Sequence, residues 1–405
     1  MIRSSVVRLV LASTVFVLSV SILRAADEWP VFRGGDGQSK SPDTGLLKEW
    51  PDGGPALLWK AEDIGKGYSA VTVAGGLVYV TGDEGEKLYI RAFDLSGKEV
   101  WKKDNGPAWK ASHPGSRASV TIDSGKAYLL SGVGVLGCYE AKTGRRLWYK
   151  EMKEWGGKPG GWGYAESPLV VGNAVIVKPG GKSCIVALNK MTGQQLWASQ
   201  SFGGPEYSSC TYFEHNKIPL IVTGTRSGII CVSAKTGQTV WTDGFCAGNT
   251  ANCPTPIYSD GHVFWSNGYG KGGICYKLDA QGKGQEVWRT RDLVSHHGGY
   301  LVQDGCIYGN HERGVTCLDL KTGQKKWTHD AVGKGSIAWA DGMLYLFSER
   351  AGQAALATCS PDGLEIKGKV KVEGGGPSWA HPVIIGGRLY LRYDTTLYCF
   401  DIKAK

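Results

Sequence analysis

A short pattern that ends in glycine, a few further residues and tryptophan recurs along the chain, and it restricts the possible folds more than any other feature. Counted from Trp59, successive tryptophans of the pattern are separated by 42, 47, 49, 44, 47 and 39 residues, and Ile366 takes the equivalent place 39 residues after the last. A period of this length indicates an array of similar structural units. The six good copies are Phe93–Trp101, Tyr139–Trp148, Leu188–Trp197, Val232–Trp241, Leu278–Trp288 and Leu318–Trp327.

Each period also contains an apolar run broken by a glycine turn. Examples are Ala70–Val80, Pro168–Val177, Thr255–Trp265 and Ile337–Leu346. Asp-Gly and Gly-Gly between β-forming residues are hairpin signals. With a third strand before the glycine turn and a fourth that carries the tryptophan, each period predicts four antiparallel strands, which is one blade of a β-propeller.

The two ends of the repeat region predict the number of blades. Leu397–Asp401 matches the strand that precedes each turn, but the chain stops before any tryptophan. Leu57–Trp59 matches a fourth strand with no blade of its own in front of it. Pairing the two closes the ring without a free sheet edge. The sequence therefore predicts an all-β protein with a lead-in over residues 26–56 and a single eight-bladed propeller over residues 57–405.

The first 25 residues indicate export. Arg3 and Arg8 precede an apolar run from Leu9 to Leu23, and alanines follow it, as in a secretory signal peptide. We expect residues 1–25 to be removed and the mature protein to lie in the periplasm or outside the cell, without a transmembrane segment. An uncleaved anchor is the alternative.

Composition narrows the classes of partner. Only 20% of the 405 residues are charged, 60 are glycine and 15 are tryptophan, which excludes a disordered chain or a coiled coil. Loss of the signal peptide lowers the formal net charge of +9 by three, and the lysines are scattered singly. We therefore expect no nucleic-acid partner, and we expect a monomer.

The repeated tryptophans are predicted to have a structural role. A large flat side chain at one position per blade, beside a glycine turn, suits packing across the seam between blades, with its N–H donating to a backbone carbonyl. The predicted docking residues are Trp59, Trp101, Trp148, Trp197, Trp241, Trp288 and Trp327.

The cysteines are also interpreted through the repeat. One repeat position, predicted to be small and buried, is assigned to Cys138, Cys231, Cys317, Cys359 and Cys399. Cys246 and Cys253 lie seven residues apart around Gly248, and either a local disulfide or free thiols are consistent with that spacing.

Residues that lead into the innermost strands are predicted to face the mouth of the central channel. The set is polar and aromatic, which suits a sugar, a peptide or an anionic quinone, and a solvated loop surface is the alternative. The candidates are Tyr68, His113, Arg117, Tyr164, Glu166, Glu206, Tyr207, Asn252, His296, His297, Lys334, Trp379 and His381.

Adjacent histidines at 296 and 297 suggest metal or acid–base chemistry. Adjacent residues on a strand point to opposite faces, so we expect at most one of His296 and His297 to face the channel. No metal site is predicted from them.

The phrase Ala-Lys-Thr-Gly-x-x-x-Trp, at Ala141–Trp148 and Ala234–Trp241, resembles the tryptophan-docking repeat of the pyrroloquinoline quinone (PQQ) β-propeller superfamily. Trp29-Pro30-x-Phe32-Arg33-Gly34-Gly35 resembles the lead-in of its secreted members. The superfamily includes quinoprotein dehydrogenases and proteins without a cofactor, such as the outer-membrane assembly factor BamB. The resemblance implies an exported, non-catalytic binding or scaffolding module with protein or extended-peptide partners and no cofactor.

The alternative that the resemblance implies is a dehydrogenase that uses PQQ and calcium to oxidise alcohols or sugars. In that case Glu166 and Asn252 would hold Ca²⁺, and Arg117 and Lys334 would lie near the quinone oxygens. The chain departs from that pattern, because Ser295–Gly298 stand where the family's aspartate base is expected and no Cys-Cys pair is present.

Overall fold

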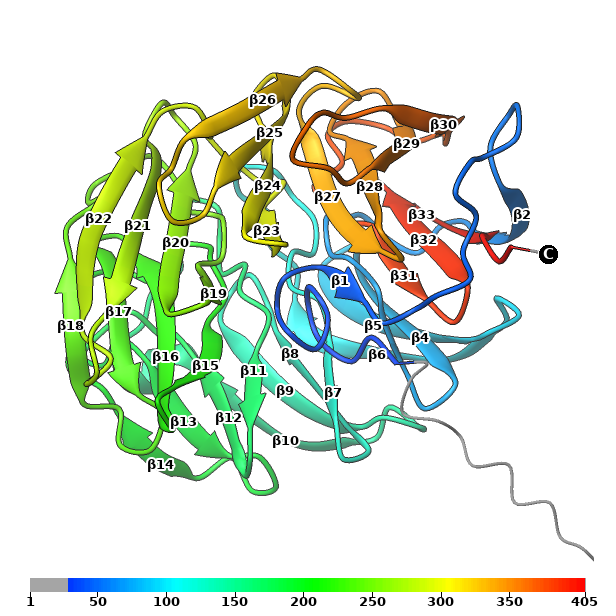
Figure 1. Cartoon of the computed structure of the whole chain (residues 1–405). Coiled ribbons are helices and arrows are strands. Elements are labelled where there is room, and N and C mark those ends of the chain that lie inside the picture. The colour runs from blue at the N-terminus through cyan, green and yellow to red at the C-terminus, as the bar shows by residue number, and fades with distance from the viewer. Residues whose placement is uncertain (1–27, 405) are drawn as a thin grey trace, which may run out of the picture.

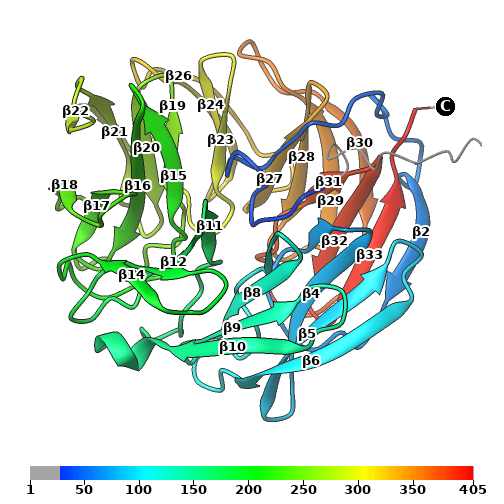
Figure 2. The same cartoon turned by 90° about the horizontal axis from the view of Figure 1, so that it is seen from below.

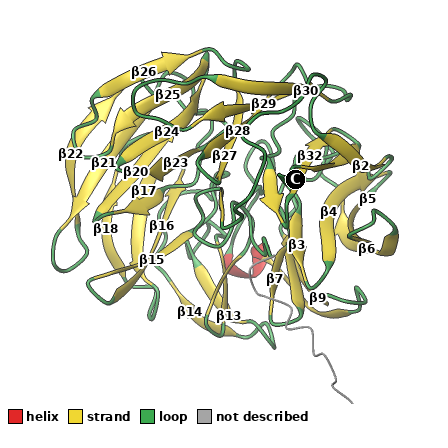
Figure 3. Ribbon diagram, turned by 45° about the vertical axis from the view of Figure 1, so that its right-hand side comes forward, coloured by secondary structure: helices red, strands yellow, loops and turns green. Residues whose placement is uncertain are grey.

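Strands account for nearly all of the regular structure in the computed structural model, which describes residues 28–404 (Figure 3). The predicted signal peptide lies outside the described residues. One short 3₁₀ helix, Met152–Trp155, interrupts the pattern of strands. No helix among the described residues is long and apolar enough to cross a membrane.

The strands form eight sheets arranged in a ring (Figure 1). The prediction of an eight-bladed propeller with four antiparallel strands per blade is therefore confirmed. The first four blades consist of β3 (Thr72–Ala74), β4 (Leu77–Glu84), β5 (Lys87–Asp94), β6 (Glu99–Pro107); β7 (Thr121–Asp123), β8 (Lys126–Leu130), β9 (Val135–Glu140), β10 (Arg146–Glu151); β11 (Leu169–Val171), β12 (Ala174–Val177), β13 (Val186–Asn189), β14 (Gln195–Ala198); and β15 (Thr211–His215), β16 (Ile218–Thr225), β17 (Gly228–Ser233), β18 (Thr239–Asp243).

The other four blades continue around the ring, and the seventh has an additional strand, β1 (Lys40–Ser41), parallel to β27. They consist of β19 (Ile257–Ser259), β20 (His262–Asn267), β21 (Gly272–Leu278), β22 (Gly284–Thr290); β23 (Tyr300–Gln303), β24 (Cys306–His311), β25 (Gly314–Asp319), β26 (Lys325–His329); β27 (Gly335–Ala340), β28 (Met343–Ser348), β29 (Gln353–Thr358), β30 (Ile366–Lys371); and β31 (Val383–Ile385), β32 (Arg388–Tyr393), β33 (Thr396–Asp401), β2 (Ala56–Ala61).

The eighth blade takes strands from both ends of the described chain. Strand β2 pairs antiparallel with β33, and Trp59 lies opposite Cys399. Figure 2 shows the blue β2 beside the red β33. The N-terminal strand is therefore the outermost strand of a blade whose other three strands come from the C-terminus.

Two-residue turns connect the inner strands of several blades. Asp341 and Gly342 both have positive φ, 48° and 79°, as do Asp260 and Gly261, with 45° and 71°. Two positive φ values are typical of the type I′ turn, whose twist matches that of a hairpin. The Asp-Gly signals in the sequence are thus located at the tips of the predicted hairpins.

The apolar core lies in the seams between neighbouring blades. One buried cluster, for example, joins Tyr79, Ile90 and Trp101 of the first blade to Leu129 and Tyr139 of the second. Because each sheet buries both faces against neighbours, the ring has a series of such cores around its channel.

Each docking tryptophan packs against the glycine turn of the next blade. The indole N–H of Trp101 donates to the Ala141 carbonyl at 3.0 Å, and that of Trp288 donates to the Leu320 carbonyl at 3.0 Å. Equivalent bonds join Trp59 to Leu95, Trp148 to Lys190, Trp197 to Ala234 and Trp327 to Ser360. A Cβ atom on the turn glycine Gly323 would lie 2.6 Å from the Trp288 ring. The turn therefore needs glycine for its positive φ and for close approach of the indole.

Two blades depart from this pattern. The Trp241 indole nitrogen has no hydrogen-bond partner within the described chain, and the segment that it faces, Leu278–Trp288, has 11 residues against 9 or 10 in the other copies. In the seventh blade, where Ile366 replaces the tryptophan, Trp50 of the lead-in packs on Tyr345 with ring centroids 6.1 Å apart. The lead-in thus supplies the missing indole.

Four of the five cysteines predicted to occupy one repeat position lie opposite a docking tryptophan. Cys138, Cys231, Cys317 and Cys399 pair with Trp148, Trp241, Trp327 and Trp59 respectively. The assignment of Cys359 to this position is wrong, because Ala357 pairs with Ile366 and Cys275 pairs with Trp288. The longer segment of the fifth blade accounts only for the unassigned Cys275, because Cys359 belongs to the seventh blade.

The lead-in winds across one end of the channel. Trp29 exchanges backbone hydrogen bonds with Val73 of the first blade, at 2.7 and 3.0 Å, and Ser39 accepts one from Trp339 of the seventh at 2.8 Å. The buried Arg33 donates to the carbonyls of Thr255 and Tyr300, in the fifth and sixth blades. These contacts reach the innermost strands of the first, sixth and seventh blades and the residues just before that of the fifth, so the lead-in ties four blades together.

Candidate functional site

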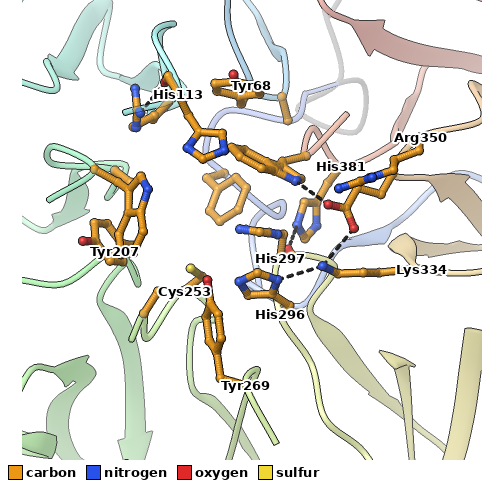
Figure 4. Close-up of a pocket in the computed structure, with 18 residues that line it drawn as sticks. Tyr68, His113, Tyr207, Cys253, Tyr269, His296, His297, Lys334, Arg350 and His381 are labelled. Carbon is orange, nitrogen blue, oxygen red and sulfur yellow. Dashed lines mark hydrogen bonds and ion pairs between the residues drawn. The ribbon is translucent and has the colours of Figure 1, made fainter. Parts of the chain in front are cut away.

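A funnel opens at the end of the channel opposite the lead-in. Loops that precede the innermost strands of all eight blades converge there around a cavity of about 310 Å³ (Figure 4). Phe32 of the lead-in also lines the cavity and packs against His381, with ring centroids 5.3 Å apart. Since Trp29 and β1 contact the far ends of the innermost strands β3 and β27, Phe32 forms the floor of the funnel.

Most of the predicted channel-mouth residues reach this cavity. The structure brings together Tyr68, His113, Arg117, Tyr207, His296, His297, Lys334, Trp379 and His381. It adds Ala70, Trp162, Ala165, Ala251, Cys253, Tyr269, Glu349 and Arg350, which the sequence analysis did not single out for the channel.

Aromatic rings form much of the wall. The Trp379 ring is stacked on His297 and lies beside Tyr68, each at 4.4 Å between centroids. Trp162 lies edge-on to Tyr207 at 5.7 Å. Such faces can hold an apolar or cationic group and orient it through their quadrupoles.

Arg117 has a fixed position at the rim. Its guanidinium donates to the carbonyls of His113, at 2.6 Å, and Ser112, at 3.1 Å. It also lies 5.9 Å from the Tyr68 ring centroid. Burial lowers the pKa of Arg117 to about 10, which still leaves it charged at neutral pH.

Lys334 and Glu349 form an ion pair inside the funnel. Lys334 Nζ lies 2.9 Å from a Glu349 carboxylate oxygen, and the Trp379 indole donates to the other oxygen at 3.0 Å. Lys334 also lies 2.8 Å from His296 Nδ1. Glu349 is the one carboxylate among the lining residues, against the three cations Arg117, Lys334 and Arg350. The lining therefore carries a net positive charge.

Both histidines of the adjacent pair line the funnel, so the expectation that at most one would do so is wrong. His296 and His297 lie on the loop before β23 rather than on a strand, and their ring centroids are 3.7 Å apart. Strand alternation does not apply to this loop. Gly298 allows it to pack closely, because a Cβ there would overlap the Gly335 carbonyl oxygen.

Two of the funnel histidines, His296 and His381, are held neutral. Burial is the main cause that lowers the pKa of His296 to about 4, and the positive charge of Lys334 acts in the same direction. Burial and Arg33 lower the pKa of His381 to about 3. At neutral pH these imidazoles therefore offer lone pairs rather than positive charge.

Four predicted residues, Tyr164, Glu166, Glu206 and Asn252, lie outside the cavity lining and hold its loops instead. The Tyr164 hydroxyl donates to the Pro179 carbonyl at 3.0 Å. Glu206 accepts the backbone N–H of Asn252 at 3.1 Å. The Asn252 side chain donates to the carbonyls of Thr225 and Cys246, at 2.9 and 3.1 Å.

Glu166 and Asn252 do not fit the calcium site that the resemblance implied. Glu166 is fully buried, and its carboxylate accepts the backbone N–H of Lys178. The Asn252 side-chain oxygen already accepts a hydrogen bond from Asn249 at 3.0 Å. Ca²⁺ needs six to eight oxygen ligands, and neither residue lines the funnel where the quinone would lie. Burial raises the pKa of Glu166 to about 7, so this carboxyl is partly protonated at neutral pH.

A buried cation occupies the region next to Glu166. The Lys178 ammonium donates to the carbonyls of Ser208 and Gly224, at 2.7 and 2.8 Å, and to the Thr223 hydroxyl at 3.1 Å. Lys178 belongs to the third blade and these acceptors to the fourth. The ammonium therefore joins the third and fourth blades through three hydrogen bonds.

Besides Phe32, eight lining residues were not predicted, and three of them share a topological reason. Tyr269 and Arg350 lie in turns between second and third strands, and Trp162 lies in the loop between β10 and β11. The prediction rested on residues that lead into the innermost strands. The positions of Trp162 among glycines and of Tyr269 between Gly268 and Gly270 were the available signals.

The fold and the funnel define an eight-bladed propeller with a ligand-sized, aromatic and basic pocket on its axis. The family described as outer membrane protein assembly factor BamB, with PQQ-like repeats, matches residues 86–329. The chain belongs to this family.

Solved structures with the same fold include members of two functional classes. BamB from Moraxella catarrhalis is 16% identical, with a TM-score of 0.64, over 86% of this chain and 98% of that one. Quinohemoprotein alcohol dehydrogenase ADHIIG from Pseudomonas putida HK5 is 14% identical, with a TM-score of 0.68, over 94% and 81%. A europium-containing methanol dehydrogenase is 12% identical, with a TM-score of 0.67, over 91% and 89%. No curated protein matches the chain.

Proposed function

We propose that this protein is an exported, non-catalytic binding module that takes an extended segment of a partner protein into its central funnel. The observation that carries the proposal is the lining of the funnel, in which aromatic faces and three cations surround a single, already paired carboxylate. Membership of the BamB family supports a role in protein binding.

The chemistry of the lining favours a particular kind of segment. Arg117, Lys334 and Arg350 attract carboxylates, and Trp162, Tyr207 and Tyr68 offer faces for an aromatic or aliphatic side chain. A cavity of about 310 Å³ holds a few side chains rather than a folded domain. The preferred partner is therefore an extended segment with an acidic residue next to an aromatic one.

Selection from a library of short, unstructured peptides tests this proposal directly. Peptides enriched on the purified protein should be rich in Asp or Glu beside an aromatic residue, and their binding should weaken as the salt concentration rises. Arg350→Ala and Trp162→Ala should each reduce affinity by roughly tenfold, in line with the loss of an interface anchor. Arg145→Ala is the control, because Arg145 is exposed on an outer turn. Peptides that bind all four proteins equally would contradict the proposal.

The alternative function is a PQQ-dependent dehydrogenase acting on alcohols or sugars. The position of the funnel on the channel axis and the presence of Arg117 and Lys334 in its lining are compatible with a quinone ligand. The positions of Glu166 and Asn252 oppose it, since neither residue lines the funnel and the Asn252 side-chain oxygen already accepts a hydrogen bond from Asn249. The binding-module proposal is therefore the better supported of the two.

A further inference from the structure

Half of the histidines in the chain gather in the funnel. His113, His296, His297 and His381 line it, out of eight histidines in the whole sequence. Cys253 joins them from the loop before β19. One donor atom from each of Cys253, His296 and His297 lies within 4.8 Å of the other two. Figure 4 shows the Cys253 sulfur and the His296 and His297 rings facing one another.

Two ring nitrogens of this cluster have no partner. His296 Nε2 and His297 Nδ1 are buried and make no hydrogen bond to any described residue. A buried polar atom without a partner is destabilising, so its presence needs an explanation. Two such nitrogens beside a thiol are what a metal ion with a preference for nitrogen and sulfur would satisfy.

The loops that carry the three side chains are held in place by neighbouring groups. The hydrogen bonds of Asn252, the residue before Cys253, to Thr225, Cys246 and Glu206 fix one loop. His381 Nε2 lies 3.0 Å from the His297 carbonyl oxygen and fixes the other. Such support of the ligand loops is typical of metal sites, because it sets the orientation of the donors.

We propose that Cys253, His296 and His297 bind a divalent transition-metal ion of the zinc type, with its fourth position open to the funnel. Zinc bonds of about 2.3 Å to sulfur and about 2.0 Å to nitrogen place ligand atoms roughly 3.3 to 3.7 Å apart in a tetrahedral site. Small side-chain rotations bring donors within 4.8 Å to that separation. The Cys253 thiol loses its proton to solvent on binding, and the metal–sulfur bond replaces the sulfur–hydrogen bond.

Lys334 opposes this site in the metal-free protein. By donating to His296 Nδ1, its ammonium holds the ring hydrogen on Nε2, the atom that faces the cluster. Metal binding moves that hydrogen to Nδ1 and breaks the Lys334–His296 bond, while Lys334 keeps its ion pair with Glu349. Lys334→Met should therefore bind the metal more tightly, and weaker binding by this variant would overturn the assigned donor atom.

Titration of the chelator-treated full-length protein with Co²⁺ tests the site. The expected result is about one Co²⁺ per chain, with a thiolate-to-cobalt charge-transfer band and the strong visible bands of tetrahedral cobalt. Zn²⁺ should displace the cobalt, and Ca²⁺ should not. Metal analysis after gel filtration gives the stoichiometry without reliance on the spectrum.

Variants assign the ligands. Cys253→Ser should abolish the charge-transfer band, and His296→Gln or His297→Gln should weaken binding by more than the roughly 10- to 100-fold that follows loss of a supporting group. Cys359→Ser and His311→Gln, which lie outside the funnel lining, should bind as the wild type does. Circular dichroism shows whether each variant is folded. Absence of binding by the folded wild type, or a charge-transfer band that persists in Cys253→Ser, would overturn the proposal. Peptide selection on metal-free protein tests the proposed function separately.

Discussion

At the scale of single residues, this propeller uses buried charged side chains to join neighbouring blades. Lys178 crosses from the third blade to the fourth, and Arg392 from the eighth to the first, where it donates to the Ser69 hydroxyl at 2.7 Å and the Gly65 carbonyl at 2.9 Å. A buried charge is tolerated only when several hydrogen bonds satisfy it. Glu166, which bonds to the backbone of Lys178, belongs to the same group of structural polar residues.

The first prediction concerns the pH dependence of stability at Glu166. Its folded-state pKa of about 7 lies above the ordinary value of 4.5, so folding favours the protonated carboxyl. The contribution of this group is complete below about pH 4.5 and is lost as the pH rises to about 7. Glu166→Gln keeps the acceptor for Lys178 and removes the titration. Relative to wild type, its free energy of unfolding should rise by on the order of 3 kcal/mol across that window.

Denaturant unfolding of both proteins at a series of pH values measures this difference. The exposed Glu312→Gln is the control and should follow the wild type. A constant difference between Glu166→Gln and wild type from acid to neutral pH would show that Glu166 is ionised in the folded protein.

At the scale of elements, the repeat is a hairpin pair closed by an indole that docks on the next turn. Glycine is needed in that turn for two reasons: the backbone has a positive φ, and a side chain would collide with the indole ring. These reasons can be separated within the sixth blade, because Gly323 and Gly305 have nearly equal φ, +71° and +73°. Only Gly323 faces an indole, that of Trp288, whereas nothing lies within 4 Å of a Cβ at Gly305.

The second prediction follows from this pair. Gly305→Ala should cost about 1 kcal/mol of unfolding free energy, from backbone strain alone. Gly323→Ala should cost roughly 1 to 3 kcal/mol more, because the new Cβ also displaces the Trp288 ring. Equilibrium unfolding followed by circular dichroism gives both values. Equal losses would show that the indole adapts without strain.

The strands and blades could be predicted from the sequence, whereas the funnel lining could be predicted only in part. The difference is that strands follow from local sequence signals and the funnel does not. Hairpin tips such as Asp341-Gly342 and the Gly-x-x-x-Trp spacing are local signals, and they sufficed for strands, blades and the number of blades. The funnel depends on where loops end in space. Strand alternation failed for His296 and His297 because they are on a loop, and Arg350 was missed because its turn reaches the axis from a different strand pair.

At the scale of the whole molecule, the lead-in combines with the ring to make a closed-ended funnel. It crosses one end of the channel. Trp50 packs on Tyr345 of the seventh blade, and Phe32 lines the cavity as the floor of the funnel. Arg33 is the central anchor of the lead-in, with hydrogen bonds to Ser39, Thr255 and Tyr300.

The third prediction is that Arg33→Met loosens this anchor. The variant keeps an apolar stem but leaves the carbonyls of Thr255 and Tyr300 without their donor, so we expect a loss of roughly 2 to 4 kcal/mol in unfolding free energy. Limited proteolysis should then cleave the lead-in faster than in wild type. Arg313→Met, on an exposed turn, is the control. Unchanged stability and proteolysis would mean that Arg33 does not anchor the lead-in.

In the proposed function, the funnel is a ligand site without a calcium–quinone centre. The most direct test is a titration of the purified mature protein with PQQ, with and without Ca²⁺, followed by tryptophan fluorescence and cofactor absorbance. We predict no Ca²⁺-dependent binding, because Glu166 and Asn252 lie outside the funnel lining and the Asn252 side-chain oxygen is already bonded to Asn249. Saturable, Ca²⁺-dependent binding near one PQQ per chain, abolished in Glu166→Ala, would contradict it.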